Sequence, residues 1–174
     1  AYSSHMKALK AQAEGRFQGQ IVPIEVHQTY VNESGKKATK NYTVYKDEGP
    51  RKGTNLEALA KLRAVFAQGG SVTAGNSSQM SDGAAFVMVV SENLMKELKL
   101  NPIARLISYA VAGVEPRIMG IGPVKAIPKA LKQAGIQQSE LELIELNEAF
   151  ASQSLAVIRE LDLNPELINV NGGA

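Results

Sequence analysis

The chain has 174 residues, 44% of them hydrophobic, and a formal net charge of +2. This composition is sufficient for the core of one domain. The sequence has no block of lysine and arginine of the kind typical of nucleic-acid binding. It also has no apolar run that is long enough to span a membrane and no segment that resembles a signal peptide. The absence of cysteine excludes disulfides, and two separated histidines, His5 and His27, do not indicate a metal site. We therefore expect a cytoplasmic protein without a metal, membrane or nucleic-acid partner.

The first part of the chain predicts a helix followed by a hairpin. Residues 2–14 are small and helix-forming, and Gly15 is a typical end for that helix. The alternating run Ile21–Val26 predicts a strand, which Pro23 restricts to an edge or entry position. A polar stretch follows, and a short strand at Tyr42–Tyr45 would complete a hairpin. A solvated loop and a subunit contact are both open for this stretch.

A second helix is expected near residue 56. Thr54 and Glu57 have the spacing of a capping box, and an apolar stripe continues from Leu56 to Phe66. Arg51 stands just ahead of this helix. Because helix N-termini attract anions, Arg51 is a candidate ligand for a phosphate group.

Small residues dominate the stretch 71–85. Gly75 and Gly83 would allow a ligand to lie close to the backbone, although a tight interior loop would use the same residues. The apolar run Phe86–Val90 then predicts a strand buried on both faces. After it, Ser91 begins a helix that reaches Leu98. A further strand is expected at Ile103–Gly113.

The last third predicts two helices and a polar residue between them. A glycine-punctuated loop at 116–123 precedes a helix that ends near Gly135, and Pro128 is expected in the first turn of that helix. The β-prone run Leu143–Leu146 then delivers Asn147 to the start of the second helix. Asn147 is expected as its N-cap, and Glu148 in the first turn would suit the helix dipole.

Three phrases of this sequence together resemble the thiolase family: Asn76–Ala85, Met119–Pro123 and Asn147–Ala151. The resemblance covers essentially the whole chain and implies an α/β fold, the layered αβαβα thiolase fold, in incomplete form. It implies a loop domain that covers coenzyme A at residues 1–75, the end of the N-terminal thiolase half at 76–100, and the first part of the C-terminal half at 101–174.

The resemblance also implies roles for individual residues. The asparagine of Asn-Glu-Ala-Phe holds a water of the oxyanion hole in thiolases, which assigns that catalytic role to Asn147. Met119 and Phe150 would border the acyl chain of the substrate. Gln79 stands where the family often has glycine, and its side chain is expected to point outward. The contacts with coenzyme A would fall to Arg51, Leu62, Phe66, Ala74 and Ser78.

Thiolases attack with a cysteine, and this chain contains none. Together with Met6 inside the first helix and a glycine-rich last stretch, this predicts a central fragment that is inactive alone. The complete protein would be a 3-ketoacyl-CoA thiolase of fatty-acid degradation, which the sequence of residues 119–123 favours. It would use coenzyme A as co-substrate without a tightly bound cofactor, as a homodimer or homotetramer. The alternatives are an acetyl-CoA acetyltransferase, a non-catalytic acyl-CoA-binding module and an unrelated phosphate-binding α/β domain.

Overall fold

The computed structural model describes residues 1–173. Within them, no helix is both long and apolar enough to cross a membrane. The chain forms helices α1 (Tyr2–Ala13), α2 (Leu56–Ala60), α3 (Glu92–Glu97), α4 (Gly122–Ala134) and α5 (Ala151–Glu160), strands β1 (Ile24–Val31) and β2 (Lys37–Val44), and 3-10 helices at Pro116–Ile121, Gln138–Glu140 and Pro165–Leu167.

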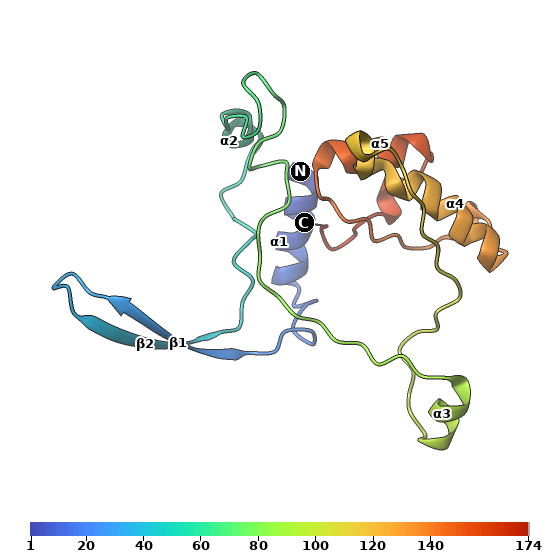
Figure 1. Ribbon diagram of the computed structural model, residues 1–174, viewed down its shortest axis with the longest axis horizontal. Helices are drawn as coiled ribbons and strands as arrows, with labels where there is room; N and C mark the ends of the chain where they lie inside the picture. Colours follow the sequence, from blue (N-terminus) through green and yellow to red (C-terminus); the bar gives the residue numbers. More distant parts are fainter. Residues whose placement is uncertain (174) are drawn as a thin grey trace.

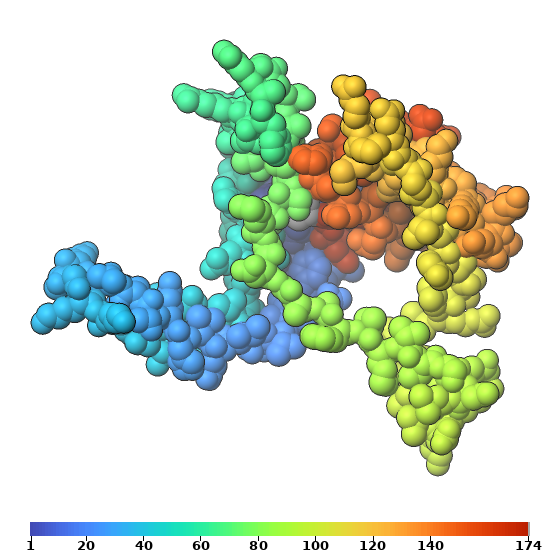
Figure 2. Space-filling model, viewed as in Figure 1, coloured from blue at the N-terminus to red at the C-terminus, as the bar shows by residue number. Residues whose placement is uncertain are grey.

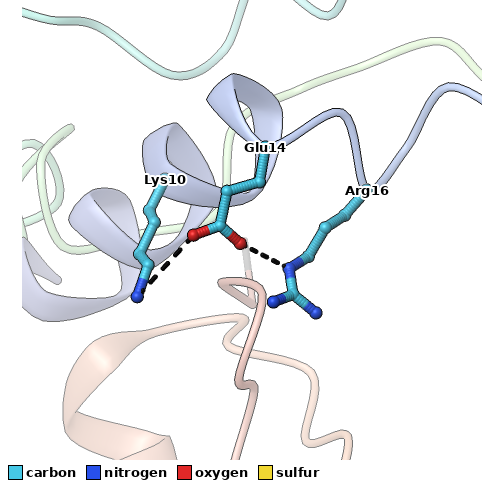
Figure 3. A network of polar contacts seen from close by, with 3 residues as sticks. All are labelled: Lys10, Glu14 and Arg16. Carbon is cyan, nitrogen blue, oxygen red and sulfur yellow. Dashed lines mark hydrogen bonds and ion pairs between the residues drawn. The ribbon is translucent and has the colours of Figure 1, made fainter.

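Helix α1 ends where the sequence predicts. Gly15 has a φ of 71°, in the left-handed region that glycine adopts without steric cost. Just beyond the last turn, Arg16 donates a hydrogen bond from Nε to Glu14 Oε2 at 2.7 Å, and Lys10 Nζ, from the last turn itself, lies 3.8 Å from Glu14 Oε1 (Figure 3). The hydrogen bond from Arg16 is the main cause that lowers the pKa of Glu14. All three side chains face solvent, so they order the end of α1 rather than any core.

The hairpin is longer than the sequence predicts. Strands β1 and β2 pair antiparallel along eight residues each, from Ile24 opposite Val44 onward. Pro23 lies just before β1, so its missing N–H costs no ladder bond. The full length of the strands could not be predicted, because a strand that is exposed on both faces shows no alternation of apolar and polar residues, and nearly all of these side chains are exposed. Figure 1 shows the hairpin projecting away from the helices.

The buried core lies in the last third of the chain, where α4 and α5 pack together (Figure 1). Its centre is Val157, which has 0% exposure, with Leu146, Leu163 and Ile168 around it. Partly buried side chains close this cluster: Val124, Ile127, Ile144, Ile158 and Leu161.

The two strands expected at Phe86–Val90 and Ile103–Gly113 are not formed. Both segments lack strand partners among the described residues, and Phe86 is 96% exposed. Figure 2 shows them as thin green and yellow lengths of chain on either side of α3. A buried strand needs a neighbour along its edge and a layer over each face. Because residues 1–173 supply neither, the prediction is wrong for this structure despite the correct apolar pattern.

The expectation that the chain fills its own core is also wrong. Its accessible surface is 14366 Å², against about 8,200 Å² for a compact monomer of this mass. Apolar side chains of the 80–113 stretch, the hairpin and the α2 region contribute to this excess, because they lie on the surface instead of packing.

Three helix details differ from the predictions. Helix α2 is capped by Asn55, whose Oδ1 accepts from the Ala58 N–H at 2.8 Å, and not by Thr54. It stops at Ala60, and the chain beyond it forms an isolated antiparallel bridge between Ala64 and Thr73 in place of further helix. Pro128 lies inside α4 and not in its first turn, where Pro123 takes that position. The helix at Ser91 agrees with the prediction, since Ser91 Oγ caps α3.

Asn147 does not cap a helix. Helix α5 begins only at Ala151, and its N-cap residue Phe150 makes no side-chain cap bond. The residues between are held extended, because the Ala149 carbonyl accepts from the Ser78 N–H at 2.9 Å. Likewise, the run Leu143–Leu146 forms a single parallel bridge and no strand.

Candidate coenzyme-binding site

A cavity of about 440 Å³ lies between α1, the α2 region, the 74–80 loop and the segment that precedes α5. This volume falls within the range typical of small-molecule sites. Apolar side chains of the α2 region form one wall, and the loop forms another. The polar lining residues are Ser4, His5, Arg51, Thr54, Asn76, Ser77, Ser78, Gln79 and Glu148.

Four of the five residues expected to contact coenzyme A line this one cavity: Arg51, Leu62, Ala74 and Ser78. Phe66 lies outside the lining. Its ring packs edge-on against Phe150, with 6.3 Å between the ring centroids. The fold therefore brings the α2 region, the small-residue loop and the start of α5 to one place.

His5 fixes the position of Arg51. His5 Nε2 accepts a hydrogen bond from the Arg51 backbone N–H at 2.7 Å and lies 3.1 Å from Thr54 Oγ1. The same Nε2 lies 3.0 Å from the Arg51 carbonyl oxygen, so the ring contacts both polar groups of the Arg51 backbone. No sequence pattern predicts this contact, because 46 residues separate His5 from Arg51 and only tertiary packing joins α1 to this loop.

The small-residue loop is stabilised from within. The Thr73 N–H donates to Asn76 Oδ1 at 2.8 Å, and Ser77 Oγ donates to the Thr73 carbonyl at 2.7 Å. Asn76 Nδ2 donates in turn to the Ser71 carbonyl at 2.9 Å. Ser78 is thus presented at the cavity by a loop whose geometry does not depend on a ligand.

Gly75 is required by a close approach. A Cβ at this position would lie 2.6 Å from both Leu59 Cδ2 and Leu62 Cδ1. The loop therefore packs directly on the apolar side of the α2 region. The glycine serves this contact between protein segments in addition to any contact with a ligand.

Gln79 is exposed, as the prediction has it, but its side chain also packs on a neighbouring segment. Its amide lies over Gly49, where a Cβ would collide with it, and it lines the cavity. Gly49 makes this position available, which explains how a long side chain is accommodated where the family often has glycine.

The residues expected near the reacting atoms lie apart from the cavity lining. Met119 is on the 3-10 helix Pro116–Ile121 and is 76% exposed. Phe150 is 36% exposed, and Asn147 is also on the surface. Glu148, in contrast, lines the cavity and accepts a hydrogen bond from Asn169 Nδ2 at 2.7 Å. The sequence pattern predicts Glu148 in the first turn of a helix, and it indicates no role for Asn169.

Family models and curated relatives match this chain throughout its length. The thiolase N-terminal domain matches residues 1–93, and the thiolase C-terminal domain matches residues 100–174. A 3-ketoacyl-CoA thiolase of Bacillus subtilis is 52% identical over 174 residues. That alignment covers 100% of this chain and 44% of the relative, so the chain spans less than half of the relative's length.

Solved structures show the same similarity. An acetyl-CoA acetyltransferase of Bacillus anthracis superposes with a TM-score of 0.88 at 47% identity, over 98% of this chain and 41% of that one. Human mitochondrial 3-ketoacyl-CoA thiolase in complex with CoA gives 0.87 at 44% identity, over 99% and 40%. The dimeric peroxisomal thiolase of Saccharomyces cerevisiae gives 0.84 at 38% identity, over 99% and 40%. These similarities confirm the expected fold class.

Proposed function

Because this chain belongs to the thiolase family, we propose that the protein that carries it is a thiolase-type acyltransferase. The proposed reaction is thiolytic cleavage of 3-ketoacyl-CoA to acyl-CoA and acetyl-CoA in fatty-acid degradation. The observation that carries it is the cavity in which Arg51, Leu62, Ala74 and Ser78 meet. The 52% identity with a 3-ketoacyl-CoA thiolase supports the degradative direction. The similarity to an acetyl-CoA acetyltransferase keeps acetoacetyl-CoA formation as the second candidate.

Coenzyme A suits the chemistry of this cavity. Its phosphates need a cation, which the Arg51 guanidinium supplies. The helix that follows Arg51 has five residues, so its dipole adds little and the charge of Arg51 carries the argument. Leu62 and Ala74 offer apolar surface to the adenine, and Ser78 a hydroxyl to the pantetheine arm. Phe66 and Phe150 form one aromatic pair that would extend this surface toward the acyl chain, near Met119.

The reacting carbonyl needs fixed donors for the negative charge that develops on its oxygen. In this proposal Asn147 holds a water in that oxyanion hole. The chain contains no cysteine, so the nucleophile would come from outside these 174 residues. Coenzyme A acts as co-substrate, and no tightly bound cofactor takes part.

The wider organisation is proposed on the same premise. We retain residues 1–75 as a loop domain over coenzyme A, 76–100 as the end of the N-terminal half and 101–174 as the start of the C-terminal half. The whole protein would be a homodimer or homotetramer, which the dimeric yeast relative supports, with the projecting hairpin as a subunit contact. A cytoplasmic location is part of the proposal, although mitochondrial and peroxisomal relatives exist.

The test is thiolysis by the thiolase-length protein, assayed with acetoacetyl-CoA and with longer 3-ketoacyl-CoA. We expect the longer substrates to give the higher kcat/KM. Arg51→Ala should raise KM for CoA by about tenfold with kcat retained, as expected for loss of one charge-assisted contact.

Lys52→Ala is the matched control, because Lys52 is an exposed cation next to Arg51 that does not line the cavity. Activity confined to acetoacetyl-CoA would establish the second candidate. Binding of acyl-CoA without turnover would indicate a non-catalytic module. Equal effects of the two substitutions on KM would remove the cavity from the proposal.

A further inference from the structure

Asn169 is a buried polar residue at the edge of the core. It is 2% exposed and has a φ of 46°, in the left-handed region that asparagine tolerates better than most residues. A buried amide is costly unless its donors and acceptor are paired. The partners of this side chain therefore show what it holds in place.

The Asn169 amide pairs with two residues of one segment, Leu146 and Glu148, which flank Asn147. Its Oδ1 accepts from the Leu146 N–H at 2.8 Å, and its Nδ2 donates to the Leu146 carbonyl at 2.7 Å. The same Nδ2 donates to Glu148 Oε1, also at 2.7 Å. The side chain thus fixes the backbone before Asn147 and the carboxylate after it.

These bonds extend a backbone bridge. The Ile144 N–H donates to the Leu167 carbonyl, and the Asn169 N–H donates to the Ile144 carbonyl, both at 2.9 Å. Beyond this point the backbone of Asn169 no longer continues the ladder, and its side chain satisfies Leu146 in place of a backbone. The result is a rigid connection from the core to the segment at the cavity.

Gly173 closes the space around the pair. A Cβ at this position would lie 2.6 Å from Glu148 Oε1 and 2.7 Å from Asn169 Cγ. Glu148 in turn lines the cavity. Asn147, between the two held residues, makes no hydrogen bond of its own among residues 1–173. Its direction is therefore set by its neighbours.

We infer that Asn169 is a positioning residue for the oxyanion site: it aims Asn147 by holding Leu146 and Glu148. This inference rests on the proposed function. Asn169 makes no hydrogen bond to Arg51 or Ser78, the polar groups proposed to bind coenzyme A, and its partners belong to the segment on either side of Asn147. Its loss should therefore affect the chemical step and not the binding of CoA.

Asn169→Asp in the thiolase-length protein tests this. The substitution keeps the shape, the left-handed backbone and the acceptor for Leu146. It replaces the donor by an oxygen that faces the Leu146 carbonyl and the Glu148 carboxylate. A misplacement of about 1 Å can cost about 10²-fold in rate, so we expect a kcat loss of that order with an unchanged KM for CoA. A residue that is only structural would lower Tm and leave the kcat of the folded enzyme intact.

Rescue gives a second readout. Glu148→Gln in the Asn169→Asp background supplies an amide that can donate to the new carboxylate, and kcat should partly recover. A double variant no faster than Asn169→Asp would overturn the link through Glu148. An unchanged kcat for folded Asn169→Asp would overturn the inference as a whole.

If Asn169→Asp does not fold, Gly173→Ala takes its place, because its Cβ presses on the same two side chains. An unchanged kcat in that variant would equally overturn the inference. A wild-type protein without thiolysis would instead remove the proposed function, and this inference with it. Wild-type turnover combined with unaffected variants would remove the inference alone.

Discussion

At the scale of the residue, position 147 shows how structure changes the meaning of a sequence pattern. Asn147 follows an apolar run and precedes a helical pattern, which favoured a helix cap. The backbone bond from Ser78 to Ala149 holds the segment extended, so α5 starts at Ala151, three residues later than a cap at Asn147 would place it. The capping explanation is therefore removed, and the exposed amide is free to serve a ligand or a water.

Asn147→Asp separates a catalytic role from a neutral surface position. The residue is exposed and caps no helix, so Tm should hardly change. If Asn147 anchors an oxyanion-hole water, the new carboxylate places negative charge beside a developing negative charge. Loss of one oxyanion donor costs about 10²–10³ in kcat, and we expect a loss in that range for thiolysis by the thiolase-length protein.

The same change at Asn93, on the exposed surface of α3, is the control for an added charge. It should leave both kcat and Tm unaffected. Full activity of Asn147→Asp would mean that no oxyanion water depends on this side chain.

At the scale of the element, the site depends on two short pieces packed on each other. Helix α2 has five residues, too few to be stable alone. The loop that carries Ser78 rests on its apolar side through Gly75, where no Cβ fits. Tertiary contact, and not helix propensity, therefore keeps this wall of the cavity in place.

Gly75→Ala tests that contact. The added Cβ would lie 2.6 Å from two leucine side chains, and such overpacking typically costs about 1–3 kcal/mol. We expect a lower Tm and a higher KM for CoA, because α2 and the loop must separate. Thermal unfolding and thiolysis kinetics measure the two effects.

Gly53→Ala provides the matched comparison, since nothing lies within 4 Å of a Cβ there. It should change neither quantity. If Gly75→Ala behaves in the same way, the packing of the loop on α2 does not control the cavity.

At the scale of the whole molecule, the large exposed surface is a consequence of the missing strands. The chain exposes 14366 Å², and the apolar 86–90 and 103–113 stretches contribute to it while unpaired. Burial is compact only where α4, α5 and the last segment meet around Val157. Pairing partners for the two stretches are absent from residues 1–173, and the chain spans 44% of its Bacillus subtilis relative.

A prediction for the purified 174-residue chain follows from its composition. Without a cysteine there is no thiolate to accept the acyl group. We expect no thiolysis of acetoacetyl-CoA above the uncatalysed rate, with the thiolase-length protein as positive control. Turnover by a chain of verified mass would show that the reaction proceeds here without a cysteine nucleophile.

Elements that depend only on nearby residues could be predicted from the sequence. Gly15 ends α1, Ser91 caps α3, and a glycine stops α4 at Gly135 with a φ of 72°. The family could also be recognised from the sequence, because the three motifs at 76–85, 119–123 and 147–151 do not depend on whether the strands are predicted correctly. Four of the five residues expected to contact coenzyme A line one cavity, and they were chosen from the family resemblance and not from predicted strands.

Features that depend on distant partners could be seen only in the folded chain. His5 reaches Arg51 across 46 residues, and Asn169 reaches Leu146 across 23. The strand at Phe86–Val90 could not form, because ladder hydrogen bonds require a second strand. The apolar pattern indicates that the segment needs such a partner but does not supply it. Periodicity records what a segment can bury, whereas the identity of the covering surface is a property of the complete fold.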